Sequence, residues 1–174
     1  MVQKIFTPKV LVIGGIIVLA ALMRLAPIYP NFTPIGAMAL FAGAHIANRK
    51  YAIGIPLLAM FLSDIFLGFH QMMLPVYLGF VLMVLIGTLL RNRIQVGNVA
   101  GGAIAGSVVF FIITNFAVWL SGTMYPMTLQ GLAQCYVAAI PFFHTSLLGD
   151  LLYSGLFFGS FYAIGKYYPA LRQA

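Results

Sequence analysis

Three ionisable residues, Arg24, Asp64 and Asp150, lie inside or at the edge of long apolar stretches, and the two aspartates are the only acidic residues of the chain. An ionised group within a membrane is costly unless it pairs or faces a wet cavity, so each is a candidate functional residue. Arg24 could pair with one or both carboxylates as a clamp between helices. The three side chains could also contact a ligand directly, and the two interpretations are compatible.

A second group of candidates combines hydrogen-bonding and aromatic side chains near the ends of the apolar stretches. An apolar wall with a few convergent polar groups is typical of a small-molecule site, although a solvated loop would contain similar residues. The group comprises Asn31, His70, Gln71, Asn115, Trp119, Gln130, Gln134, Tyr136, His144 and Thr145.

Catalytic patterns are largely missing from the sequence. Asp64 and Asp150 lack the Gly-x-Gly-Asp and Tyr-Asp contexts of intramembrane aspartyl proteases, and Ser154-Gly155 with His144 does not form a rhomboid pattern. The chain has no glycine-rich phosphate loop and no His-Glu-x-x-His motif. Its single cysteine excludes an intrachain disulfide, and no Cys/His spacing suits zinc. We therefore expect no enzyme, no metal site and no prosthetic group.

The composition indicates how these residues are positioned. Hydrophobic residues make up 63% of the chain and charged residues 6%, whereas a water-facing surface needs about a quarter of its residues charged. The chain is therefore expected to be an integral membrane protein with an all-α fold. Its 174 residues suit a single transmembrane domain over residues 1–174, with about six helices. The net charge of +7 reflects basic residues between spans, which indicate topology rather than nucleic-acid binding.

Hydropathy and helix breakers predict a six-transmembrane-helix bundle with spans at residues 9–27, 32–48, 51–69, 74–90, 97–120 and 141–165. Six spans place both termini and the loops after the second and fourth spans on one side. Basic residues other than Arg24 fall in these segments, namely Lys4, Lys9, Arg49, Lys50, Arg91, Arg93, Lys166 and Arg172. This distribution predicts a multi-pass protein of the bacterial cytoplasmic membrane with both termini cytoplasmic. The first span is expected to be retained, because no Ala-x-Ala cleavage site ends it.

Small residues suggest where helices pack. In the stretch from Tyr29 to Lys50, Ala39 and Gly43 lie one turn apart, which lets a neighbouring helix approach closely. We expect this segment to be a packed inner helix with Asn31 and Thr33 at its entrance. Two further pairs have the same spacing and favour packing within the chain over a partner helix, namely Gly102 with Gly106 and Gly155 with Gly159.

Residues 121–140 form the longest piece outside the spans. Leu129, Leu132, Tyr136 and Ile140 recur at helical spacing, with glutamines on another face. This pattern predicts a short amphipathic helix at the outer interface. It would act as a lid over a site or would simply cap the bundle.

Four motifs carry a resemblance to a family. They are Pro30-Asn-Phe-Thr-Pro-Ile-Gly-Ala-Met-Ala-Leu-Phe-Ala-Gly, Leu62-Ser-Asp-Ile-Phe-Leu-Gly-Phe, Thr114-Asn-Phe-Ala-Val-Trp and Ile140-Pro-Phe-Phe-His-Thr-Ser-Leu-Leu-Gly-Asp. From Arg24 onward the chain resembles a bacterial family of small integral membrane proteins that is defined as a domain of unknown function.

More distantly, the chain resembles the substrate-binding S components of energy-coupling factor (ECF) vitamin transporters, especially the solitary cobalamin-binding ones. Pro75-Val-Tyr77 matches their Pro-x-Tyr motif. The resemblance implies an outer pocket for a vitamin, with an ECF coupling subunit and ATPases as partners. The chain lacks the Ala-x-x-x-Ala pair of many S components, and His70-Gln71 stands where the cobalamin group has a cysteine. Because imidazole can ligate cobalt, His70 would be the metal ligand if the solute were a corrinoid.

We therefore expect an S-component-like protein that binds a small vitamin-like solute for uptake, in a pocket between the outer ends of the first, third, fifth and sixth spans. Arg24 would hold an anionic group, His70 and Gln71 would contact the solute, Asn115 would hydrogen bond it and Trp119 would stack on it. The other expected ligand-binding residues are Asn31, Asp64, Tyr77, Gln134, His144 and Asp150. Two alternatives stay open, a self-contained small secondary transporter or channel and a non-transporting membrane assembly or structural protein.

Overall fold

The computed structural model describes residues 8–25 and 29–168, which form six helices. Their bounds are α1 Pro8–Leu25, α2 Ile35–His45, α3 Arg49–Leu67, α4 Met73–Leu89, α5 Val96–Leu120 and α6 Leu129–Tyr167. Within these ranges the only extended pairing is an isolated bridge between Tyr29 and Phe32. The prediction of an all-α fold with six helical segments is confirmed.

Three helices are long and apolar enough to cross a membrane, namely α3, α5 and α6. This finding agrees with the prediction of a membrane protein. The apolar helices α2 and α4 are shorter, and the 11 residues of α2 extend over only about 16 Å. A hydrocarbon core is about 30 Å thick, so α2 reaches across roughly half of that thickness.

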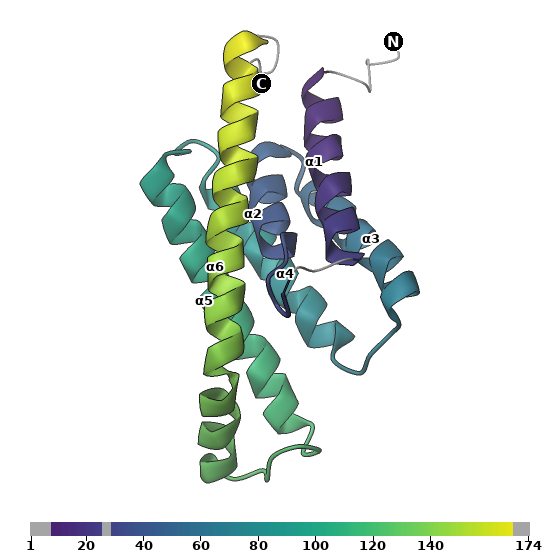
Figure 1. The fold of residues 1–174 in the computed structure, drawn as a ribbon, viewed down its shortest axis with the longest axis vertical. Coiled ribbons are helices and arrows are strands. Elements are labelled where there is room, and N and C mark those ends of the chain that lie inside the picture. The colour runs from purple at the N-terminus through teal and green to yellow at the C-terminus, as the bar shows by residue number, and fades with distance from the viewer. Residues whose placement is uncertain (1–7, 26–28, 169–174) are drawn as a thin grey trace.

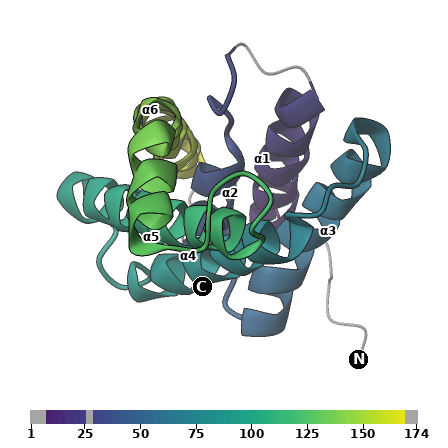
Figure 2. The same cartoon turned by 90° about the horizontal axis from the view of Figure 1, so that it is seen from below.

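The short helix α2 is the centre of the molecule. Every residue from Ile35 to Ala44 is buried, and α2 contacts each of the other five helices; Figure 2 shows it between α1, α4 and α6. A Cβ added to Gly43 would lie 2.1 Å from the Val84 carbonyl oxygen, and one on Gly87 would lie 2.2 Å from the Leu40 carbonyl oxygen. The α2 and α4 backbones thus touch, which confirms the prediction of a packed inner helix with small residues at its contact.

The other small-residue pairs differ from each other. Gly102 packs against Leu90 and Gly106 against Met83, as expected for contacts within the chain. Gly155 and Gly159, in contrast, have open space where a Cβ would lie. The expectation of internal packing is therefore wrong for the pair on α6, because both glycines are exposed and a cavity separates this part of α6 from the start of α5.

The helix ends divide between two sides of the molecule. In Figure 1 the start of α1, the end of α6, the α2–α3 turn and the α4–α5 loop lie toward the top, while the α3–α4 and α5–α6 loops lie toward the bottom. The upper side carries the basic residues Lys9, Arg49, Lys50, Arg91, Arg93 and Lys166. Lys4 and Arg172 lie outside the described residues. The charge asymmetry anticipated from the sequence is therefore present in three dimensions.

The structure differs from the sequence-based expectation at residues 121–140. Instead of a separate interfacial helix followed by a sixth span, α6 runs for 39 residues from Leu129 to Tyr167 and contains Pro141. The Thr128 side chain caps its start by accepting a hydrogen bond from the Gly131 backbone N–H at 3.1 Å. Proline removes only one backbone donor, and the helix continues on both sides of it. At about 58 Å, α6 exceeds a bilayer of about 40–45 Å, and the α5–α6 hairpin extends below α1 to α4 in Figure 1.

Candidate functional site

A cavity of about 460 Å³ lies between the start of α2, the middle of α4 and long segments of α5 and α6. This volume is within the range of about 300–1,000 Å³ that is usual for small-molecule sites. Its apolar wall is formed by Phe80, Met83, Phe110, Phe111, Ala139, Phe142 and Phe143. Its polar lining is formed by Asn31, Thr33, Ser107, Thr114, Asn115, Ser146 and Asp150, with Gly36 beside them.

Among the described residues that line this cavity, Asp150 is the ionisable one, and it is only 7% exposed. Its Oδ2 atom accepts a hydrogen bond from the Ser107 hydroxyl at 2.6 Å, and its carboxylate also accepts one from the Ala37 backbone N–H. A Cβ on Gly36 would lie 2.1 Å from Oδ1, so the carboxylate rests directly on the first turn of α2. The residue that precedes this turn, Pro34, supplies no side-chain cap. Asp150 therefore caps α2 from another helix, where the helix dipole favours a negative charge.

Arg91 caps the other end of α2, the C-terminal end. Its Nε donates to the Gly43 carbonyl oxygen at 2.9 Å, Nη1 to that of Ala47 at 3.0 Å and Nη2 to that of Ile46 at 2.6 Å. The last carbonyls of a helix have no partner within the helix, and a cation is favoured there. The short buried helix is thus capped at both ends by charged side chains from α6 and from the loop after α4.

The segment before α2 brings two polar residues to the cavity. The Phe32 backbone N–H donates to the Tyr29 carbonyl oxygen at 3.0 Å, and Asn31 has a φ of 62°, a left-handed conformation that asparagine tolerates well. This turn places Asn31 and Thr33 on the cavity lining, as expected for the entrance of α2. Their side chains have no hydrogen-bond partner within residues 8–25 and 29–168, so both are available to a ligand.

On α5, Thr114 and Asn115 line the cavity next to two phenylalanines. The Thr114 hydroxyl donates to the Phe110 carbonyl oxygen at 2.8 Å, and the Asn115 amide nitrogen donates to that of Phe111 at 2.8 Å. No donor from the described part of the chain reaches the side-chain oxygen of Asn115. The expected role of Asn115 as a hydrogen-bonding group of a site is compatible with this placement.

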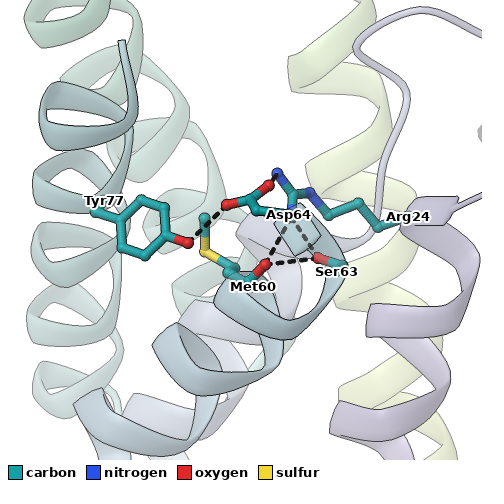
Figure 3. A network of polar contacts seen from close by, with 5 residues as sticks. All are labelled: Arg24, Met60, Ser63, Asp64 and Tyr77. Atoms are coloured by element: carbon teal, nitrogen blue, oxygen red, sulfur yellow. Dashed lines mark hydrogen bonds and ion pairs between the residues drawn. The ribbon is translucent and has the colours of Figure 1, made fainter. Parts of the chain in front are cut away.

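A separate cluster, the Arg24–Asp64 clamp, joins α1, α3 and α4 (Figure 3). Arg24 Nη2 and Asp64 Oδ1 are 2.5 Å apart, and Tyr77 donates its hydroxyl to Asp64 Oδ2 at 2.6 Å. Arg24 Nη1 also donates to the Met60 carbonyl oxygen at 3.0 Å and to the Ser63 hydroxyl. Both carboxylate oxygens of Asp64 are satisfied within the protein. The interpretation of Arg24 as a clamp between helices is confirmed.

The remaining candidates lie away from the cavity. His70 and Gln71 are exposed in the α3–α4 loop, and Gln134 and His144 are exposed on α6. The Trp119 ring nitrogen donates to the carbonyl oxygens of Pro126 and Thr128 at 3.1 and 3.2 Å. These hydrogen bonds connect the α5–α6 loop to the end of α5. Of the expected ligand-binding residues, Asn31, Asn115 and Asp150 line the cavity, whereas Arg24, Asp64 and Tyr77 form the clamp.

Sequence reasoning overlooked several residues that the cavity requires. Ser107 and Ser146 were not proposed as site residues, although each lies one or two helical turns from a cavity phenylalanine. The signal was a shared pattern: residues 107, 110, 111 and 114 on α5, and residues 139, 142, 143 and 146 on α6, repeat at i, i+3, i+4 and i+7. That spacing places each set on one helix face. No comparable sequence pattern marks Gly36, because its importance comes from its contact with the Asp150 carboxylate on α6.

The fold and the cavity define a small all-helical protein with three helices that could span a membrane and an internal, partly polar cavity. The chain belongs to a family of unknown function, DUF6580, whose model matches residues 4–171. This membership confirms the resemblance to a family of unknown function over nearly the whole chain. No curated protein and no solved structure matches the chain, so no comparison links it to the S components of ECF transporters.

Proposed function

We propose that this protein binds a small solute in the cavity between α2, α4, α5 and α6 and serves its uptake across the bacterial cytoplasmic membrane. The observation that carries the proposal is the cavity itself, in which a buried carboxylate and unpartnered polar groups meet an aromatic wall. Sites for small molecules are usually apolar cavities with a few convergent polar groups.

In the proposed membrane arrangement each of the six helices forms one crossing. The crossing that contains α2 is completed by the non-helical segment that leads into this helix. Non-helical backbone is tolerated at membrane depth where it is buried in protein or lines a cavity, and residues 29–34 lead directly to the cavity. The basic side of the molecule would face the cytoplasm. Asn31 and Phe142, which are exposed residues of the lining, would then be reached from outside the cell.

The proposed solute is smaller than a corrinoid. A cavity of about 460 Å³ lies toward the lower end of the range for small-molecule sites, about 300–1,000 Å³. His70, the residue that would ligate cobalt, does not line the cavity. A vitamin-like metabolite of modest size is therefore the better candidate. In the S-component form of the proposal, an ECF coupling subunit and ATPases would supply energy.

A second candidate function is that of a self-contained secondary transporter. It is favoured by the start of α2, where a short helix begins at the cavity after an irregular segment and meets a buried carboxylate. Transporters often build their sites from such interrupted helices near the middle of the membrane. The two functions differ in whether the chain alone moves its solute.

The test begins with mass spectrometry of the full chain extracted in mild detergent, to identify a co-purified small molecule, and with affinity capture of ATPase partners. Asn115→Ala should deplete the co-purified molecule, whereas Gln134→Ala, an exposed residue outside the cavity, should retain it. Uptake by liposomes that contain the chain alone would favour the secondary transporter. Equal retention by both variants would contradict a solute site at this cavity.

A further inference from the structure

Asp150 differs from Asp64 in its charge balance. Asp64 forms an ion pair with Arg24, and this pair is the only one among the described residues. Asp150 receives hydrogen bonds from a hydroxyl and a backbone N–H, which are neutral donors. A helix N-terminus supplies the equivalent of only about half a positive charge. The cavity therefore contains a carboxyl group without a cationic partner, and no lysine, arginine or histidine among the described residues lines it.

The wall facing this carboxylate is aromatic. Phe80 and Phe110 have ring centroids 4.8 Å apart, as do Phe111 and Phe143, so α4, α5 and α6 each contribute rings. Aromatic faces attract cations, and the attraction is larger when the cation is desolvated. A carboxylate and several phenylalanine rings around one cavity favour a positively charged guest. An anionic guest would meet the Asp150 carboxylate without a basic side chain to offset it.

We propose that the solute bound in this cavity is a small organic cation, with its ammonium group against the Asp150 carboxylate and its carbon atoms against the phenylalanine rings. This inference rests on the proposed function and specifies its ligand class. The remaining polar groups, from Asn31, Thr33 and Ser146, would hydrogen bond a hydroxyl or amide elsewhere on the solute. The aromatic wall distinguishes an organic cation from an inorganic one, which would prefer a shell of oxygen ligands.

The experiment measures ligand binding by thermal shift and calorimetry on the purified full chain in detergent. The probes are tetramethylammonium, choline and ethanolamine, each compared with a neutral molecule of similar shape, such as 3,3-dimethylbutan-1-ol for choline, and with sodium chloride. At least one organic cation should raise the unfolding temperature while its neutral counterpart does not. Equal effects of the neutral molecule, an effect of sodium alone, or no effect of any cation would overturn the proposal.

Single-residue variants test whether the cation binds in this cavity. Asp150→Asn should weaken cation binding roughly ten-fold or more, because a charge-assisted contact is lost, while the amide oxygen can still accept from the Ser107 hydroxyl. Phe111→Leu should weaken binding several-fold. Phe116→Leu, on the same helix but exposed and outside the lining, is the matched control and should bind normally. Unchanged binding in Asp150→Asn would overturn the proposal.

The outcomes also separate this inference from the proposed function. If mass spectrometry finds a neutral or anionic molecule that is lost in Asn115→Ala, the cavity binds a solute and only the assignment as a cation is wrong. If no molecule co-purifies and no probe binds, both proposals fail.

Discussion

Arg91 and Asp150 hold opposite ends of the same buried helix. The guanidinium of Arg91 donates to three carbonyl oxygens at the C-terminal end of α2, and the carboxylate of Asp150 accepts from its first turn. Each charge has the sign that the helix dipole favours at its position. A helix of 11 residues would be marginal alone in water, so its stability depends on packing and on these two caps.

The first prediction concerns the C-terminal cap. Arg91→Ala removes three hydrogen bonds, one to the Gly43 carbonyl in α2 and two to the carbonyls of Ile46 and Ala47 that directly follow it, and should lower the free energy of unfolding by about 2–3 kcal/mol. Arg91→Lys should recover only part of this loss, because an ammonium cannot reproduce the planar fork of guanidinium donors. The measurement is reversible unfolding in mixed detergent micelles. Arg93→Ala, an exposed neighbour, serves as the control, and equal losses in Arg91→Ala and Arg93→Ala would contradict the capping role.

The second prediction uses two glycines in helices. Gly43→Ala should destabilise the protein, because the new Cβ would lie 2.1 Å from the Val84 carbonyl oxygen and would force α2 and α4 apart. Gly155→Ala should be neutral or stabilising by up to about 1 kcal/mol, since the site is open and alanine is the better helix former. Thermal unfolding of both variants in the same detergent measures the difference. Similar behaviour of the two would show that α2 and α4 do not touch as described.

The third prediction concerns the Arg24–Asp64 clamp. Arg24→Gln or Asp64→Asn leaves one buried partner without the other and should cost about 3–5 kcal/mol. The double variant should cost less than the sum of the two single changes. Unfolding free energies of the four proteins in this cycle measure the coupling. Additive losses would mean that the two residues act independently.

The fourth prediction tests the membrane orientation. In a Cys135→Ala background, Met124→Cys in the α5–α6 loop should react with a membrane-impermeant maleimide added to intact cells. Asn92→Cys in the α4–α5 loop should react only after permeabilisation, because the basic side is expected to face the cytoplasm. Both wild-type residues are exposed. The opposite labelling pattern would invert the topology and place the cavity entrance on the cytoplasmic side.

Much of the fold could be predicted from local sequence properties. Apolar stretches separated by Pro, Gly and basic residues indicated six helices, and the positions of Arg49, Lys50, Arg91 and Arg93 indicated which ends lie together. Such signals are carried by the residues themselves. The continuity of α6 through Pro141 could not be predicted in the same way, because whether a proline ends a helix depends on the surrounding contacts.

The candidate site was less predictable, because it depends on which helices meet. The sequence contains two aspartates in similar apolar contexts, yet one pairs with Arg24 and the other caps α2 beside a cavity. Gly36 and Ala37 form the partner of Asp150 although they are more than a hundred positions away in the sequence. Ser107 and Ser146 appear as ordinary small residues until α5 and α6 are placed side by side.

The capping of α2 at both ends also restricts how the molecule can move. Sliding α2 along its axis would separate one of its ends from the side chain that caps it. At the buried Asp150 end, little water is present to replace the lost hydrogen bonds. Within residues 8–25 and 29–168, no charged side chain caps the far end of the α5–α6 hairpin, which extends beyond α1 to α4. A movement that leaves both caps intact would therefore be confined to the far part of this hairpin, because Asp150 on α6 stays against the first turn of α2.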